Sequence, residues 1–141
     1  MCLLSIVRGR STQYSISAGE LQTKLQNIGV TVPCYLFDNN YWYVSHEDWG
    51  KIFEDVLLNM PGYTTEKFDC EDFALLVKVR VSERYQLNTI AIIIGDSPWG
   101  RHGYNMFLSE AGLFLLEPQT GEVFAIGETG YEQYKPHLAV I

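Results

Sequence analysis

The chain has 141 residues, a formal net charge of −7 and a pI of about 4.8. An acidic surface of this kind argues against nucleic acid or an anionic membrane as the partner. A hydrophobic fraction of 47% with 19% charged residues predicts a globular protein of one domain, residues 1–141. We find no apolar run long enough to cross a bilayer. We also find no signal peptide, because the apolar start at residues 1–7 ends at Arg8. We therefore expect a cytoplasmic protein. Its three cysteines lack metal-ligand spacing, which indicates free thiols in a reducing compartment.

The first sixty residues predict mainly helices. Ser17 to Glu20 has the pattern of a capping box and opens a helix that ends at Gly29. Residues 30–37 read as an edge strand interrupted by Pro33, and 41–44 as a short aromatic strand. A second helix follows Ser45, with an apolar face at Trp49, Ile52, Phe53, Val56, Leu57 and Met60. His46, at its start, is expected to be an exposed residue of the cap. Residues 1–14 are ambiguous between an edge strand and a disordered end.

A third helix, from Asp69 to about Tyr85, is the centre of the prediction. Asp69 suits the N-cap, and Asp72 stands three residues later, as in a capping box. Cys70 then lies in the first turn, where the helix dipole favours a thiolate.

The second half predicts strands at residues 89–94, 102–108, 113–117 and 122–126, with a hairpin turn at 109–112. The tail, residues 127–141, fits no element. The layout is α+β, with the central helix packed on an antiparallel sheet. We divide it into a helical part, about residues 1–60, and a core, about residues 61–126.

The hairpin brings candidate catalytic groups together. If Ser109 pairs with Gly112, Glu117 becomes the diagonal neighbour of His102 on the same face, roughly 7–8 Å away between α-carbons. Cys70, His102 and Glu117 could then act as nucleophile, base and orienting acid. Gln119, directly opposite His102 in this register, is the alternative to Glu117. Asn105 is an odd number of residues from His102, so we assign it a structural role on the other face.

Over about residues 66–120 the chain resembles the transglutaminase-like branch of the papain-like cysteine peptidase superfamily. The motifs that carry the resemblance are Cys70-x-Asp72-x-Ala74, His102-Gly103-Tyr104 and Glu117-Pro118-Gln119-Thr120. Gly103-Tyr104 replaces the usual Ala-Trp, and Glu117 replaces the commoner aspartate, as in some papain-like agglutinin-associated proteases. The glutamine that papain-like enzymes place just before the cysteine is absent.

The resemblance implies a papain-like core and a hydrolase or acyltransferase that cleaves or transfers amide bonds through a thioester on Cys70. Its substrate would be a protein or peptide, and it needs no cofactor. The sequence does not distinguish peptidase, deamidase and transglutaminase activity.

Two further hypotheses about the function stay open. The first is a catalytically inactive module that binds a peptide, glycan or protein through its aromatic residues, with Trp42 and Trp99 as the binding residues. The second is a structural or accessory subunit. We also consider a Ca²⁺ site at Asp69, Glu71 and Asp72 as the alternative to simple helix capping. The oligomeric state is not predicted.

Overall fold

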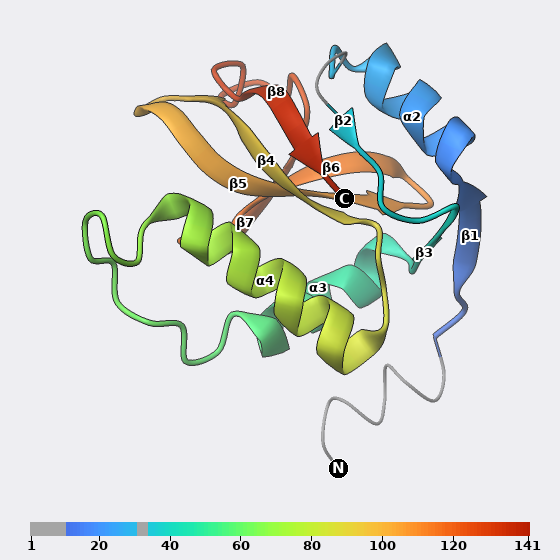
Figure 1. Ribbon diagram of the computed structural model, residues 1–141, viewed down its shortest axis with the longest axis horizontal. Coiled ribbons are helices and arrows are strands. Elements are labelled where there is room, and N and C mark those ends of the chain that lie inside the picture. The colour runs from blue at the N-terminus through green and yellow to red at the C-terminus, as the bar shows by residue number, and fades with distance from the viewer. Residues whose placement is uncertain (1–10, 31–33) are drawn as a thin grey trace.

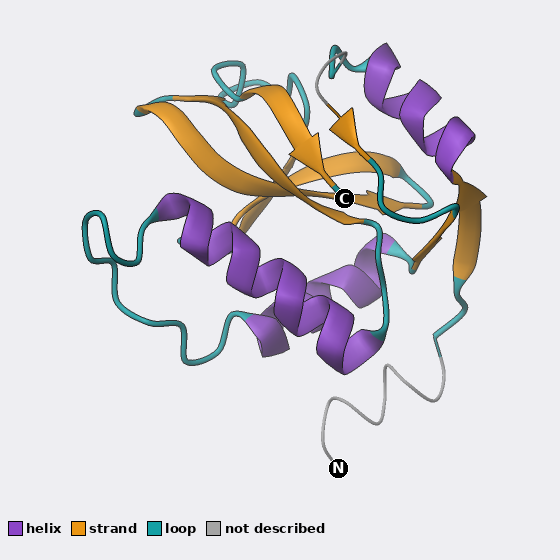
Figure 2. Cartoon of the chain, viewed as in Figure 1, coloured by secondary structure: helices purple, strands orange, loops and turns teal. Residues whose placement is uncertain are grey.

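The computed structural model describes residues 11–30 and 34–141 (Figures 1 and 2). In these residues the helices are α2 (Ala18–Asn27), α3 (His46–Val56) and α4 (Cys70–Tyr85). The strands are β1 (Tyr14–Ser17), β2 (Cys34–Tyr35), β3 (Asn40–Tyr43), β4 (Ile90–Ser97), β5 (Gly100–Ser109), β6 (Gly112–Glu117), β7 (Glu122–Ala125) and β8 (Lys135–Val140). No helix in the described ranges is long and apolar enough to cross a membrane.

Six of the strands form one sheet in the order β2-β8-β4-β5-β6-β7. Every neighbouring pair is antiparallel except β2 and β8, which run parallel. The expectation of an antiparallel sheet is therefore wrong, because the sheet is mixed. The unplaced tail supplies β8, and the first sixty residues supply the edge strand β2, so strands from both ends of the chain complete the sheet.

The other two strands, β1 and β3, form a separate antiparallel ribbon beside α2 (Figure 1). The aromatic strand expected at 41–44 is β3. Strand β1 begins at Tyr14, where the ambiguous residues 1–14 end, and was not expected. The capping box of α2 is confirmed, since the Ser17 N–H donates to the Glu20 carboxylate (3.0 Å) and the Glu20 N–H to the Ser17 hydroxyl (3.2 Å).

The sheet is covered on both faces. Alternate residues of a strand point to opposite faces, and the buried side chains divide accordingly into two clusters. On one face, Ile93, Tyr104 and Met106 pack with residues of α2 and the ribbon. On the other face, Ile90 and Phe107 pack with residues of α3 and α4.

Helix α3 buries most of the face that its spacing predicts, with Trp49, Ile52, Phe53 and Val56 at 4% exposure or less. The helix ends at Val56, so Leu57 and Met60 of the predicted face lie beyond it and are half-buried. The Trp49 indole N–H donates to the Leu108 carbonyl oxygen (2.7 Å), which fixes the helix to β5. His46 differs from the expectation of an exposed cap residue. It is half-buried, with its ring 4.4 Å from the ring of Phe114.

Helix α4 lies across β4 and β5 (Figure 1). Its start is as predicted, because the Asp69 N–H donates to the Asp72 carboxylate (3.2 Å). The structural role of Asn105 is confirmed as well. Its buried amide donates to the carbonyl oxygens of Ala74 in α4 (2.9 Å) and Ala91 in β4 (3.0 Å), and so joins the helix to the sheet.

Candidate functional site

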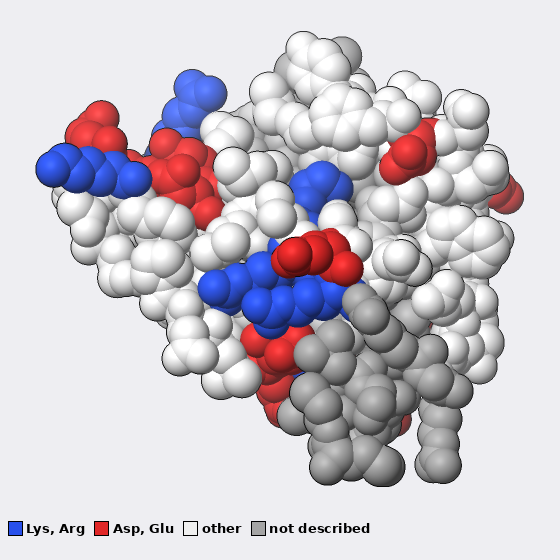
Figure 3. All heavy atoms as spheres, turned by 60° about the horizontal axis from the view of Figure 1, so that its bottom comes forward, with Lys and Arg blue, Asp and Glu red and all other residues white. Residues whose placement is uncertain are grey.

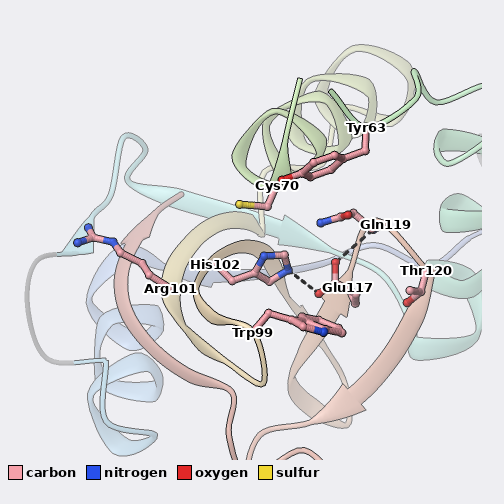
Figure 4. A pocket seen from close by; sticks show the side chains of 8 residues that line it. All are labelled: Tyr63, Cys70, Trp99, Arg101, His102, Glu117, Gln119 and Thr120. Carbon is pink, nitrogen blue, oxygen red and sulfur yellow. Dashed lines mark hydrogen bonds and ion pairs between the residues drawn. The ribbon is translucent and has the colours of Figure 1, made fainter. Parts of the chain in front are cut away.

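A cavity of about 420 Å³ opens where the first turn of α4, the β4–β5 turn and the end of β6 meet (Figure 4). It is lined by Tyr63, Cys70, Trp99, Arg101, His102, Glu117, Gln119 and Thr120. The structure therefore brings the predicted residues Cys70, His102, Glu117, Gln119 and Trp99 to one place. The other three lining residues, Tyr63, Arg101 and Thr120, were not among the predicted site residues.

The other predicted binding residue, Trp42, does not line the cavity. It lies on β3 in the two-stranded ribbon, where its backbone N–H donates to the side-chain oxygen of Asn88 (2.7 Å). Its side chain is 45% exposed.

The contact between His102 and Glu117 follows from the hairpin register. Ser109 pairs with Gly112, as predicted, and Asn105 pairs with Leu116. The imidazole Nε2 of His102 donates to the Glu117 carboxylate over 2.7 Å. Both residues are buried, at 7% and 1% exposure. A buried carboxylate needs several donors, and Glu117 has them.

The further donors to Glu117 are the Tyr134 hydroxyl (3.1 Å) and the backbone N–H of Gln119 (3.3 Å). Burial and the charge of Glu117 raise the pKa of Tyr134 well above its ordinary value, so its phenol stays protonated and donates. Tyr134 belongs to the tail that the sequence left unplaced. A local pattern could not have assigned it to this site.

Cys70 is the first residue of α4, as predicted, but its surroundings do not favour a thiolate. Burial raises the pKa of the Cys70 thiol, and the neighbouring carboxylates of Glu71 and Asp69 add to the rise. A hydrogen bond from the Gly103 N–H opposes this only in part. The thiol donates to Glu71 (3.3 Å), and in the described residues no hydrogen bond joins it to His102. The expected effect of the helix dipole is outweighed by burial and by negative charge.

Gly103 permits the close approach of β5 to the start of α4. A β-carbon at this position would lie 2.8 Å from the Glu71 α-carbon and 2.9 Å from its nitrogen. Both are backbone atoms that cannot rotate away, so the close contact requires glycine. This contact places the Cys70 sulfur above the strand that carries His102.

An acidic group flanks the cavity. The carboxylates of Asp69 and Glu71 share a hydrogen bond, which raises the pKa of Asp69 and lowers that of Glu71. One ligand atom from each of Asp69, Cys70 and Glu71 lies within 4.8 Å of the other two. Asp72 is outside this group and accepts the N–H of the helix cap. A Ca²⁺ site at Asp69, Glu71 and Asp72 stays a hypothesis, with the carboxylate of Asp72 occupied by capping.

Two aromatic side chains flank the mouth of the cavity (Figure 4). Trp99 is 71% exposed and stands in the β4–β5 turn, where its backbone N–H donates to the Ser97 hydroxyl (3.2 Å). Tyr63 is 56% exposed and belongs to the loop between α3 and α4. The rings of Trp99 and His102 make a T-shaped contact, with 5.7 Å between ring centroids and 68° between their planes. The rim is thus aromatic, and the floor is polar.

Arg80 of α4 fixes the start of the loop that carries Tyr63. Its guanidinium donates to the carbonyl oxygens of Val56 (2.6 Å) and Leu58 (2.8 Å) at the end of α3. Val56 is the last residue of α3, so its carbonyl accepts no hydrogen bond within the helix, and the charge of Arg80 caps this end of it.

Comparison with known proteins assigns the family. The model of the agglutinin C-terminal family matches residues 41–123, which is more than half of the chain. The chain belongs to the agglutinin C-terminal family. No curated protein sequence gives a significant match.

Two solved structures share the fold. One is the PSL1a-E64 complex, with a TM-score of 0.73 and 23% identity over 90% of this chain. The other is the lectin of Polyporus squamosus bound to the epitope Neu5Acα2-6Galβ1-4GlcNAc, with a TM-score of 0.72 and 21% identity over 90% of this chain. The alignments cover 51% and 49% of those chains, so this chain spans about half their length.

These findings overturn the resemblance stated from the sequence. The prediction of a papain-like, transglutaminase-like core is wrong, because the family is that of agglutinins and the mixed six-stranded sheet with three helices in the described residues matches lectin structures. The prediction of a cysteine-dependent hydrolase or acyltransferase acting on amide bonds is wrong, because the family match is to agglutinins. The raised pKa of the Cys70 thiol is in keeping with this correction.

Proposed function

We propose that this chain is a glycan-binding domain and that the cavity beside Trp99 holds the sugar. The observation that carries the proposal is the combination of membership of an agglutinin family with a cavity that has exposed aromatic side chains at its mouth and polar groups at its floor. Of the alternatives read from the sequence, the inactive module that binds a glycan fits this combination best.

The cavity suits a sugar in size and in chemistry. Its volume of about 420 Å³ lies in the range of small-molecule sites. A pyranose ring has an apolar face of C–H groups and an edge of hydroxyls. Trp99 and Tyr63 offer flat apolar surfaces at the mouth, and Gln119 and Thr120 offer polar groups for the edge. The neighbouring lectin binds an epitope in which two of the three sugars are N-acetylated, as their names Neu5Ac and GlcNAc state.

In this proposal the His102–Glu117 pair shapes the floor of the cavity. Its buried hydrogen bonds hold the end of β6 against β5, and the bond from Tyr134 ties the tail of the chain to the same point. The cavity is therefore largely preformed, which reduces the entropy lost on binding.

The experiment is a glycan array followed by titration of the best ligand into two tryptophan variants. Trp99→Ala removes an exposed ring at the cavity, and Trp42→Ala removes an exposed ring elsewhere, so the second is a matched control. We expect Trp99→Ala to weaken binding by about tenfold or more, which is ~1.4 kcal/mol. Trp42→Ala should bind as the wild type does.

The proposal fails if no glycan on the array binds. The assignment to this cavity fails if a glycan binds and Trp99→Ala leaves its affinity unchanged.

A further inference from the structure

We propose that a second site, an apolar groove beside α4, binds an aliphatic monocarboxylate, a fatty acid of medium chain length, with its carboxylate on Lys78. The inference does not depend on the proposed function, because the groove shares no lining residue with the cavity at Trp99.

The groove lies over a part of the sheet that α4 leaves uncovered. Helix α4 packs on β4 and β5, whereas β8 lies on the other side of β4. Ile92 of β4 pairs with Val140 of β8, and both are only half-buried. Together with α4 they form a groove of about 570 Å³, which is within the range of small-molecule sites. Its lining residues are Phe37, Leu75, Lys78, Val79, Ser82, Glu83, Ile92 and Val140.

The wall that α4 contributes is an exposed apolar stripe. Leu75 and Val79 are one turn apart, and they are 48% and 50% exposed. The opposite side of the same helix buries Phe73 and Val77, so the core does not account for the stripe. Phe37, which is 71% exposed, adds a ring to the lining. Figure 3 shows that much of the surface on this side of the molecule carries no charge. An exposed apolar surface of this kind marks a binding site.

Lys78 places one cation in this lining. Its ammonium group donates to the Ile90 carbonyl oxygen (2.8 Å), and no carboxylate of the described residues forms an ion pair with it. Burial lowers the pKa of Lys78, and the charge of Asp38 opposes this. An ammonium group has three donors, so two remain for a ligand. A ligand carboxylate would accept them in charge-assisted hydrogen bonds, which are stronger than neutral ones.

The rest of the lining favours a carboxylate that carries an alkyl chain. Glu83 lines the groove five residues further along α4, and its like charge directs a carboxylate to Lys78. From Leu75 to Glu83 the helix rises about 12 Å, and most of the side chains that line this length are apolar. A small anion would leave this apolar surface uncovered, whereas an alkyl chain would cover it.

The experiment compares three ligands with the same alkyl chain. The full chain is titrated with octanoate, octanol and octylamine at about pH 7, below their critical micelle concentrations, by ligand-observed NMR. We expect octanoate to bind at least about tenfold more tightly than octanol, and octylamine to bind no more tightly than octanol. In ¹³C–¹H spectra the methyl signals of Leu75, Val79 and Ile92 should shift with octanoate, because these residues line the groove.

One variant pair tests the cation. Lys78→Met removes the charge and keeps an apolar side chain, and Lys67→Met makes the same change in the exposed loop before α4. We expect Lys78→Met to bind octanoate no more tightly than octanol, and Lys67→Met to bind as the wild type does. Circular dichroism checks that each variant is folded.

A second pair tests the wall and does not depend on the folding of Lys78→Met. Val79→Glu places a carboxylate in the groove at a half-exposed position, and Val123→Glu places one on β7, at the opposite edge of the sheet from β2. We expect Val79→Glu to lose octanoate binding and Val123→Glu to retain it.

Four results would overturn the proposal. The first is the absence of octanoate binding, and the second is binding of octanol or octylamine as tight as that of octanoate. The third is octanoate that shifts the Trp99 indole signal instead of the groove methyls, which would place it in the other cavity. The fourth is a dimer in analytical ultracentrifugation that Val79→Glu dissociates, in a protein that binds no octanoate, because a second copy of the chain would then cover the groove.

Discussion

Gly103→Ala is the substitution that tests most directly how β5 and α4 form the site. The new β-carbon would lie 2.8 Å from the Glu71 α-carbon, 2.9 Å from its nitrogen and 3.2 Å from the Cys70 carbonyl carbon. All three are backbone atoms, so relief requires the start of α4 to move away from the strand. Overpacking of this kind costs about 1–3 kcal/mol. For a chain of this length that corresponds to a melting temperature lower by about 3 °C per kcal/mol.

Gly50→Ala is the matched control for Gly103→Ala. It makes the same chemical change on the exposed side of α3, where a β-carbon meets nothing within 4 Å. Alanine is the better helix former, so this variant should be more stable by about 0.5–1 kcal/mol. Urea denaturation followed by circular dichroism measures both. If Gly103→Ala unfolds at the same urea concentration as the wild type, the close packing of β5 on the start of α4 is refuted.

Other substitutions test the buried groups around the site. Tyr134→Phe removes one donor from the buried carboxylate of Glu117 and should lower stability by about 1–3 kcal/mol in urea denaturation; an unchanged midpoint would show that this bond contributes nothing. Asn105→Ala breaks two buried hydrogen bonds between α4 and the sheet and should cost about 2–3 kcal/mol, and wild-type stability would contradict that role. The raised pKa of Cys70 means that iodoacetamide should label it more slowly at pH 7 than it labels N-acetylcysteine, with faster labelling as the contrary result. Because the pKa of Cys70 is higher in the folded than in the unfolded protein, its thiol contributes to stability at all pH values below the unfolded pKa of about 8.5. This contribution should be lost as the pH rises through the higher pKa of the folded protein. If the Ca²⁺ hypothesis is correct, millimolar CaCl₂ raises the melting temperature of the wild type and not of Asp69→Asn.

The parts of the fold that the sequence predicted are those set by local rules. The capping boxes at Ser17 and Asp69 fixed two helix starts, and the apolar spacing from Trp49 to Val56 fixed the buried face of α3. The contact of His102 with Glu117 was accessible too, because a tight hairpin turn determines the register of both strands.

The parts that were missed depend on distant partners. The position of β8 beside β4 is set by pairing between residues more than 40 positions apart, such as Ile93 with Ala139. Nothing in the local sequence of the tail indicates that partner. Tyr134 reaches Glu117 only because β8 brings the tail to that end of the sheet. The parallel pairing of β2 with β8 has the same origin.

The function was predicted wrongly because the order of three residues does not determine their chemistry. Cys70, His102 and Glu117 do line one cavity, as the motifs implied. The resemblance was extended from that order to an enzyme family, whereas the family match is to agglutinins. The carboxylates beside Cys70 are visible in the sequence, but its burial, the largest cause of the raised thiol pKa, is not.

The most direct test of the central proposal uses the three tryptophans of the chain as reporters. The indole N–H signals of Trp42, Trp49 and Trp99 are assigned by substitution, and the glycan selected on the array is titrated while ¹⁵N–¹H spectra are recorded. Trp99 stands at the cavity, Trp49 is buried with its N–H bonded to Leu108, and Trp42 is exposed on the ribbon. If the cavity binds the glycan, the Trp99 signal shifts in a saturable way and the other two remain in place. A shift of Trp42 alone, or no shift of any indole at saturating glycan, would contradict the proposal.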